Sequence, residues 1–131
     1  MQNNFKLFLA LFLCFSIKIV NAQASSAEKL RYAKKFAFNY CIFNNYSKLD
    51  SNYHKVYKDA SGLVFSIYGK FNENEEVKKK LIDFILRKTS TFFSQRTALQ
   101  DISKNIVICN CLNFYESVEL QTFVVKLFSV K

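Results

Sequence analysis

Apolar residues recur every three or four positions through most of this chain, and little in it would interrupt a helix. Among 131 residues there is no proline, and glycine occurs only twice. A fold of many short strands needs a turn every ~8–12 residues, and the two residues that punctuate chains most strongly are scarce here. The sequence therefore predicts an all-α fold, a compact single-domain bundle of about five helices.

The helical spacing also gives approximate bounds for the elements. The first helix is expected over residues 26–46, and the third begins near Glu73 with a buried face that reaches Phe92. Two more helices are expected within residues 106–131. Short apolar runs there also suit strands, but their spacing favours helices, with Ser117 as the cap of the last one.

The second helix is predicted from an apolar stripe that begins at Tyr53 and continues to Ile67. Gly69 follows the stripe and is expected to end this helix in the manner of a C-terminal glycine cap. The sequence thus predicts one continuous helix here, and its small residues Ala60, Ser61 and Gly62 would let another helix approach closely.

The beginning of the chain has the pattern of an export signal. Lys6 precedes an apolar run over residues 7–20, which is shorter than the about 20 apolar residues that a membrane-spanning helix needs. Val20 and Ala22 supply the small residues that signal peptidase accepts, so cleavage is predicted after Ala22, with Ala24 as second choice. The alternatives are an uncleaved anchor or a buried first helix.

Cleavage divides the chain into a signal peptide, residues 1–22, and one helical domain, residues 23–131, that acts outside the cytoplasm without a stable membrane anchor. Its net charge falls from +9 to +7 (9 − 2) because Lys6 and Lys18 leave with the signal. A basic surface keeps a protein dissolved, or it meets an acidic partner or an anionic envelope polymer. No nucleic-acid-binding motif is present, so nucleic acid is not an expected partner.

The longest basic run is Lys78–Lys80, directly after two glutamates. Glu75 and Lys79, and likewise Glu76 and Lys80, are four residues apart and can pair on one helix face. This spacing favours a solvated helix surface over a binding patch.

Three cysteines remain after export, and an oxidising compartment favours their pairing. Cys41 and Cys111 each lie on the apolar stripe of their helix, so they form the best pair. Cys109 lies about 200° around the helix from Cys111 and is left over. We expect it to be buried and inert, with an intermolecular disulfide as the alternative. His54 is the single histidine, so neither a zinc site nor any other cofactor is expected.

The sequence contains no pattern typical of an enzyme. His54 lies among polar residues at the start of the second helix, where a solvated side chain is expected, and there is no Gly-rich phosphate loop or serine nucleophile motif. By elimination this favours a binding protein. The longest aperiodic stretch, Phe93 to Lys104, is either a functional loop or a mobile connection.

Four segments together resemble a known family, the periplasmic immunity proteins that neutralise type VI secretion amidase effectors of the fourth amidase family. The resemblance covers nearly all of the chain after the signal, and its most specific piece is the final segment. The segments are Tyr32-Ala33-Lys34-Lys35-Phe36-Ala37 leading to Tyr40-Cys41, Lys58-Asp59-Ala60-Ser61-Gly62, Tyr68-Gly69-Lys70-Phe71, and Cys111-Leu112-Asn113-Phe114-Tyr115-Glu116-Ser117-Val118-Glu119-Leu120.

The resemblance implies an all-helical homodimer in the periplasm, with a disulfide between Cys41 and Cys111. It also implies a partner, a secreted peptidoglycan amidase with a Cys/His catalytic site, which the inhibitor blocks by inserting a loop into the active-site groove. The loop contacts, with Arg96 as the anchor, are expected at Ser94, Gln95, Arg96, Thr97, Gln100 and Asp101. A helix of the other subunit would add contacts at Lys79, Lys80 and Asp83.

Two other functions compete with this one. The first is a non-enzymatic exported module that binds an anionic envelope polymer or lipid through its positive surface. Such binding should weaken steeply as salt is added, whereas a packed inhibitory interface should weaken less. The second is a secreted enzyme of unknown type, which would be expected to need His54.

Overall fold

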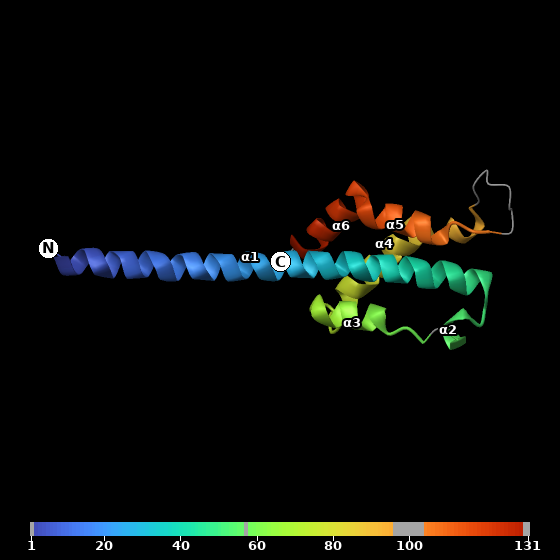
Figure 1. Ribbon diagram of the computed structural model, residues 1–131, viewed down its shortest axis with the longest axis horizontal. Coiled ribbons are helices and arrows are strands. Elements are labelled where there is room, and N and C mark those ends of the chain that lie inside the picture. The colour runs from blue at the N-terminus through green and yellow to red at the C-terminus, as the bar shows by residue number, and fades with distance from the viewer. Residues whose placement is uncertain (1, 57, 96–103, 130–131) are drawn as a thin grey trace.

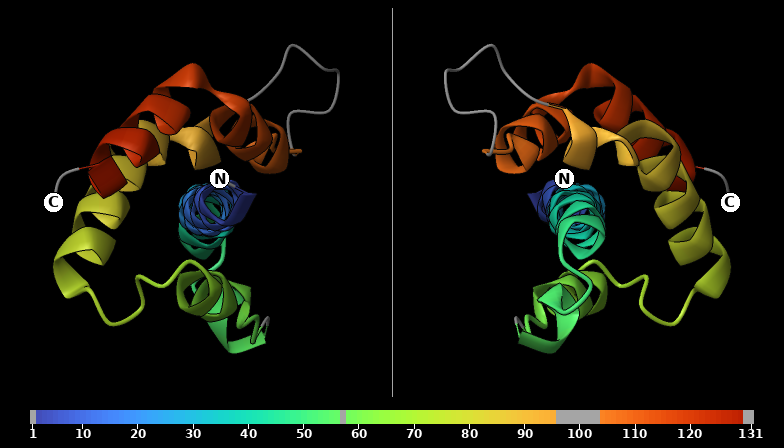
Figure 2. Two further views of the ribbon diagram at one scale, coloured as in Figure 1. Left: turned by 90° about the vertical axis from the view of Figure 1, so that its left-hand side faces the viewer. Right: turned by 90° about the vertical axis from the view of Figure 1, so that its right-hand side faces the viewer.

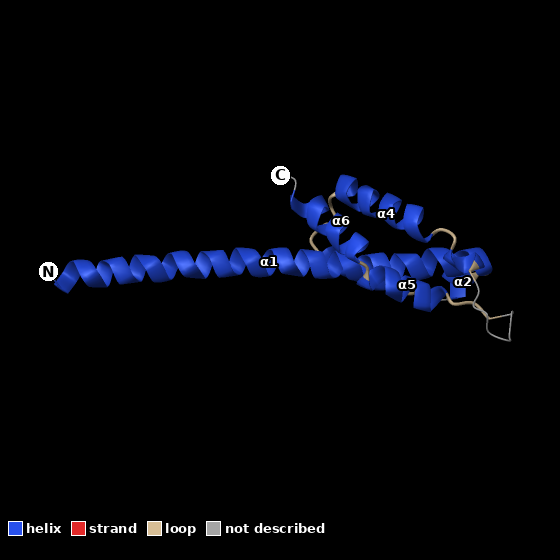
Figure 3. Cartoon of the chain, turned by 90° about the horizontal axis from the view of Figure 1, so that it is seen from above, coloured by secondary structure: helices blue, strands red, loops and turns tan. Residues whose placement is uncertain are grey.

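The computed structural model of the chain describes residues 2–56, 58–95 and 104–129, with side chains from Ser26 onward. Every regular element in this part is helical, so the predicted all-α fold is confirmed (Figure 3). The elements are α1 (Gln2–Leu49), α2 (Tyr53–Val56), α3 (Ser61–Tyr68), α4 (Glu75–Thr89), the 3-10 helix η1 (Phe92–Ser94), α5 (Val107–Glu116) and α6 (Val118–Ser129).

Helix α1 forms the axis around which the other helices pack. Its second half runs through the bundle, while its first half extends beyond the other helices (Figure 1). In end-on view, α1 lies between α3 on one side and α5 and α6 on the other, with α4 along its flank (Figure 2). Each of the other helices contacts α1, so the core is built around this single helix.

Small residues on α1 allow this close packing. Ala33, Ala37 and Cys41 are fully buried and follow one another at helical spacing, so they present a narrow surface to the surrounding helices. The core is completed by Phe36 of α1, by Phe71 in the turn after α3, and by residues of α4, α5 and α6. The residues on these three helices are Leu81, Phe84, Ile85, Val107, Cys111, Phe114, Leu120 and Val124.

The predicted disulfide between Cys41 and Cys111 is confirmed. It joins α1 to α5 across 70 residues of sequence, with the two Cα atoms 5.8 Å apart and both side chains fully buried. One turn further along α1, the buried Asn45 donates through Nδ2 to the Cys41 carbonyl at 2.9 Å and accepts from the Phe93 backbone N–H at 2.9 Å. The same stretch of α1 is therefore tied covalently to α5 and by hydrogen bonds to η1.

Helix α1 differs from the first predicted helix at its beginning. The helix is continuous through residues 25–28, where the sequence predicted a start near residue 26. The expected cleavage point after Ala22 lies inside α1, before the first described side chain, and it stays a prediction. Among the residues that the structure describes, no helix combines the length and apolar character needed to cross a bilayer.

The prediction of one continuous helix from Tyr53 to Ile67 is wrong. The chain forms the short α2, leaves helical geometry at residues 58–60, and starts again as α3 at Ser61. Asp59 stabilises the chain at this second start, because its Oδ1 accepts from both the backbone N–H (2.8 Å) and the hydroxyl (2.6 Å) of Ser61. These two hydrogen bonds also hold the pKa of the Asp59 carboxyl below its ordinary value.

The apolar face of α3 is exposed to solvent rather than buried. Leu63, Val64 and Ile67 are 54%, 41% and 53% exposed. Instead, the small residues Gly62 and Ser66 face α1, and a Cβ placed on Gly62 would lie 2.7 Å from Asn39 Oδ1. Phe65 also lies on this side, with its ring centroid 6.4 Å from that of Tyr32, so the side of α3 that meets α1 combines small residues with one aromatic ring.

Helix α3 ends at the expected place but by a different geometry. Gly69 has φ −73°, an ordinary helical value, while Lys70 adopts the left-handed conformation with φ 56°. Glycine is required at position 69 for space, because a Cβ there would overlap the ring of Phe71. That ring is 1% exposed and packs edge-on against Phe36, with centroids 5.6 Å apart.

We therefore expect Gly69→Ala to lower the free energy of unfolding by about 1–3 kcal/mol, because the core ring must move to admit the methyl group. Urea denaturation followed by circular dichroism measures the change. Gly62→Ala is the matched comparison and should cost less, since the atom its methyl would meet is the end of the Asn39 side chain. Equal or greater stability of Gly69→Ala would contradict this explanation.

Helix α4 follows its predicted pattern closely. Asn74 caps it by accepting from the Val77 backbone N–H at 3.1 Å, so the helix begins at Glu75 rather than near Glu73. Glu76 and Lys80 form the predicted pair at 2.6 Å. No ion pair forms between Glu75 and Lys79, both of which lie in the described part of the chain.

Candidate functional site

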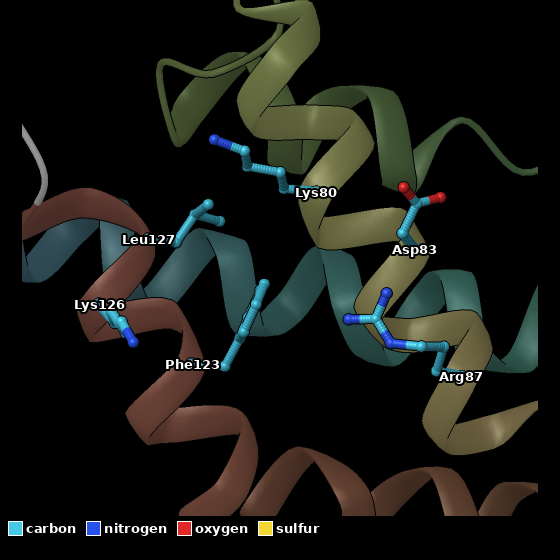
Figure 4. A pocket seen from close by; sticks show the side chains of 6 residues that line it. All are labelled: Lys80, Asp83, Arg87, Phe123, Lys126 and Leu127. Carbon is cyan, nitrogen blue, oxygen red and sulfur yellow. The ribbon is translucent and has the colours of Figure 1, made fainter.

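The clearest candidate binding site is a groove between α4 and α6, with a volume of about 290 Å³. Figure 4 shows its side chains, which come from the two helices only. The lining residues are Lys80, Asp83, Arg87, Phe123, Lys126 and Leu127. We call this site the α4–α6 groove.

The floor of the α4–α6 groove is apolar. Phe123 stacks on Phe84 with ring centroids 3.9 Å apart and planes at 4°, and Leu127 lies one turn further along α6. Phe84 is itself buried and also contacts Phe114 of α5, at 6.2 Å between centroids. The floor is therefore a continuation of the core rather than a loose surface contact.

The walls carry three cations and one carboxylate. Lys80 is paired with Glu76, but neither Arg87 nor Lys126 forms an ion pair with any carboxylate that the structure describes. Figure 4 shows the Arg87 guanidinium directed toward Phe123, whereas the Asp83 carboxylate points away from Phe123 and Leu127. The groove therefore has a positive character above an apolar floor.

Asp83 influences α1 rather than the groove. Burial, and in second place the Asp83 carboxylate, raise the pKa of the Tyr40 hydroxyl above its ordinary value. A phenol that is partly removed from water and near a negative charge resists ionisation, so Tyr40 stays neutral at physiological pH. Among the described residues, no ion pair joins Asp83 to Arg87.

A salt bridge fixes the two helices beside the groove. Lys88 Nζ lies 2.5 Å from Glu119 Oε1, which joins the end of α4 to the start of α6. Both side chains are about half exposed, so this pair contributes little to stability. Its effect is to neutralise Lys88 and leave Arg87, one residue earlier, as the cation directed into the groove.

The structure brings some of the predicted contact residues to this site and leaves others elsewhere. Lys80 and Asp83 line the groove, while Lys79 is exposed on α4 outside the lining. Ser94 and Gln95 do not line it either. The remaining four predicted contacts, Arg96, Thr97, Gln100 and Asp101, lie outside the described residues.

Ser94 and Gln95 belong to a second structured region, where the chain leaves η1. Ser94 Oγ donates to the Thr91 carbonyl at 2.8 Å, and Gln95 Oε1 accepts from Asn110 Nδ2 of α5 at 2.8 Å. On the far flank, Asn105 Oδ1 accepts from the Val107 N–H at 3.2 Å. The start of the aperiodic stretch is thus held on α5, and the chain after it is hydrogen-bonded to the first residue of α5.

Sequence reasoning missed four residues of the groove. Arg87 lies near the end of its helix, where a cation suits the helix dipole, and Phe123 and Leu127 recur at the spacing of an ordinary buried stripe. Lys126 carried no signal at all. Each local explanation was sufficient by itself, and only the packing of α4 against α6 places these residues together.

The expectation for Cys109 is wrong. Its thiol is free and exposed, and Asn113 Nδ2 lies within 3.9 Å of the sulfur. The buried face of α5 is formed by Val107, Cys111 and Phe114, so Cys109 points away from it. Its neighbour Ile108 is likewise 55% exposed.

No group of three His, Cys, Asp or Glu side chains that could hold a metal ion occurs among the described residues. His54 lies exposed on α2, as its polar surroundings predicted. Comparison with protein families, curated proteins and solved structures finds no match to this chain. The functional argument therefore depends on the chain's own residues and geometry.

Proposed function

We propose that this protein is a periplasmic, non-enzymatic inhibitor that binds and occludes the active site of a type VI secretion peptidoglycan amidase, and so protects the cell wall from attack by sibling cells. It would act as a homodimer, with the segment after η1 inserted into the amidase groove. The observation that supports this best is the Cys41–Cys111 disulfide. It joins the two positions that the family resemblance relates residue by residue.

The disulfide also bears on location. Buried disulfides persist in oxidising compartments and are rare in the cytoplasm, so this bond is compatible with export. A toxin that cuts cell wall must be neutralised where the wall is. The predicted signal peptide and the disulfide therefore agree with the proposed site of action.

The helices around the predicted contact segment hold the chain that leads into it, which is an arrangement suited to a binding loop. Asn45 holds η1 on α1, and the Gln95–Asn110 hydrogen bond holds the chain on α5 just before the predicted contact segment. A loop whose flanks are fixed in this way loses less conformational entropy when it binds. Insertion of such a loop would occlude an active site without any catalytic chemistry in the inhibitor.

The proposal is tested by protection and by direct binding. Cells producing a periplasmic Cys/His amidase should survive when the full chain is co-expressed, and should lyse when residues 1–22 are deleted. The exported protein should co-purify with the amidase and abolish its peptidoglycan cleavage. Equal protection by the form without the signal would overturn the proposal.

A point variant tests the inserted segment itself. We expect Arg96→Glu to weaken amidase binding at least about tenfold, because a reversed charge at an interface anchor costs 1.4 kcal/mol or more. Isothermal titration calorimetry with the purified amidase measures the change. Lys55→Glu reverses an exposed charge on α2 and should bind like the wild type. If both variants bind equally well, the segment after η1 is not the contact.

A further inference from the structure

Some of the cations that line the α4–α6 groove have a carboxylate partner and others do not. Lys80 has Glu76, and Lys88 has Glu119, but Arg87 and Lys126 have no carboxylate among the described residues. The two unpaired cations lie on opposite helices with Phe123 between them (Figure 4). Both cations are exposed, so a ligand that supplies negative charge can reach and pair with them.

The apolar floor restricts the ligand further. Phe123 and Leu127 form a surface that an apolar side chain can cover, and the stack on Phe84 holds Phe123 in place. Free phosphate or another small inorganic anion would leave this surface in contact with water. The best-fitting occupant therefore combines a carboxylate with a neighbouring aliphatic or aromatic side chain.

We propose that the α4–α6 groove is a docking site for an acidic segment of a partner protein, whose carboxylates pair with Arg87 and with Lys126 while an apolar side chain between them packs on Phe123 and Leu127. Charge complementarity carries this choice, since two of the three cations in the groove have no carboxylate partner among the described residues and the Asp83 carboxylate points away from Phe123 and Leu127. Arginine is well suited to the role because its planar guanidinium can bind a carboxylate through two hydrogen bonds.

This inference rests on the proposed function for the identity of the partner, which would be the amidase, but not for the chemistry of the groove. The groove lining includes neither Ser94 nor Gln95, so it would form a second contact apart from the segment after η1. An anionic lipid surface is the competing occupant. It needs a broad basic face, whereas the two unpaired cations here border a hollow of about 290 Å³.

The test uses the protein purified from the periplasm and a synthetic pentapeptide of alternating glutamate and leucine. In an NMR titration, we expect saturable shifts at the backbone amides of residues 87, 123 and 126. Arg87→Glu combined with Lys126→Glu should weaken the peptide affinity at least about tenfold. Lys55→Glu should leave it unchanged, and circular dichroism should show that each variant is folded.

Two matched ligands distinguish the possible occupants. A peptide with glutamine in place of glutamate should bind at least about tenfold more weakly, because it lacks the charge. Vesicles of phosphatidylglycerol should not compete with the peptide. Equal binding of the two peptides, no effect of the charge reversals, or competition by the vesicles would each overturn the inference.

Amidase binding separates this inference from the proposed function. One possible outcome is that the charge reversals weaken binding of the acidic peptide while the wild-type protein binds no amidase. The proposed function then fails, but the inference that the groove binds an acidic segment stands. If the amidase is inhibited equally by wild type and charge-reversed protein, the function stands and the groove is not its docking site.

Discussion

Replacing Cys41 and Cys111 together with alanine is expected to lower the free energy of unfolding by about 4 kcal/mol. The disulfide closes a loop of 70 residues, and the chain-entropy relation gives about 4.4 kcal/mol for a loop of this length. Because a small domain is stable by only about 5–15 kcal/mol, this loss is a large fraction of the total. Guanidinium unfolding of the oxidised, reduced and double-alanine proteins measures it.

Cys109→Ser provides the matched control, since it removes a thiol that is exposed and unbonded to another cysteine. Its unfolding free energy should lie within about 0.5 kcal/mol of the wild type. If reduction changes the stability by less than about 1 kcal/mol, the entropic account of the bond is wrong.

The double-alanine variant also helps to interpret the protection experiment. A chain without its signal stays reduced in the cytoplasm, so it could fail to protect because it is less stable rather than because it is misplaced. The exported double-alanine variant separates the two causes. Protection by that variant, together with failure of the form without the signal, would attribute the need for export to location.

Some of the fold follows from local rules, which is why it could be predicted. Helix α4 has acidic residues at its start, basic residues at its end and one apolar face, and these features act within a few residues of each other. The Cys41–Cys111 bond was predictable for a similar reason. Each cysteine shares a stripe with buried neighbours, and two buried stripes in a small helical domain must face the same core.

Helix α3 shows where periodicity fails. The spacing of Leu63, Val64 and Ile67 identifies one face of a helix, but the same spacing results whether that face is covered or displayed. Which face of α3 meets α1 depends on Gly62 and Ser66, because these residues are small enough for α3 to approach α1 closely. The small size of Gly62 indicated in the sequence that another helix could approach closely, but it did not indicate that this helix would be α1.

The α4–α6 groove was unpredictable for a further reason. Arg87 and Lys126 are far apart in sequence, and each has a sufficient local explanation as a solvated cation. Their lack of a carboxylate partner appears only when all neighbouring side chains are placed. Unbalanced charge is therefore a property of tertiary structure, and it cannot be read from one helix at a time.

The second large effect is expected at Phe84, which links three helices. Phe84→Ala should lower the free energy of unfolding by about 3–5 kcal/mol, because it removes a buried ring that contacts Phe123 of α6 and Phe114 of α5. Phe43→Ala is the comparison, since that ring is 42% exposed, and it should cost much less. Guanidinium unfolding of both variants provides the measurement, and equal losses would contradict the assignment of Phe84 to the core.

Phe84→Leu then tests whether the same ring shapes the groove. Leucine fills most of the volume, so the stability loss should stay below about 1.5 kcal/mol and the protein should remain folded. It cannot stack on Phe123, whose ring would lose the flat surface that lies 3.9 Å beneath it. If Phe123 must be held in place for an apolar side chain to pack on it, Phe84→Leu should weaken the glutamate–leucine peptide while leaving the fold intact. Unchanged peptide affinity would show that the charges of Arg87 and Lys126 define the groove without a fixed floor.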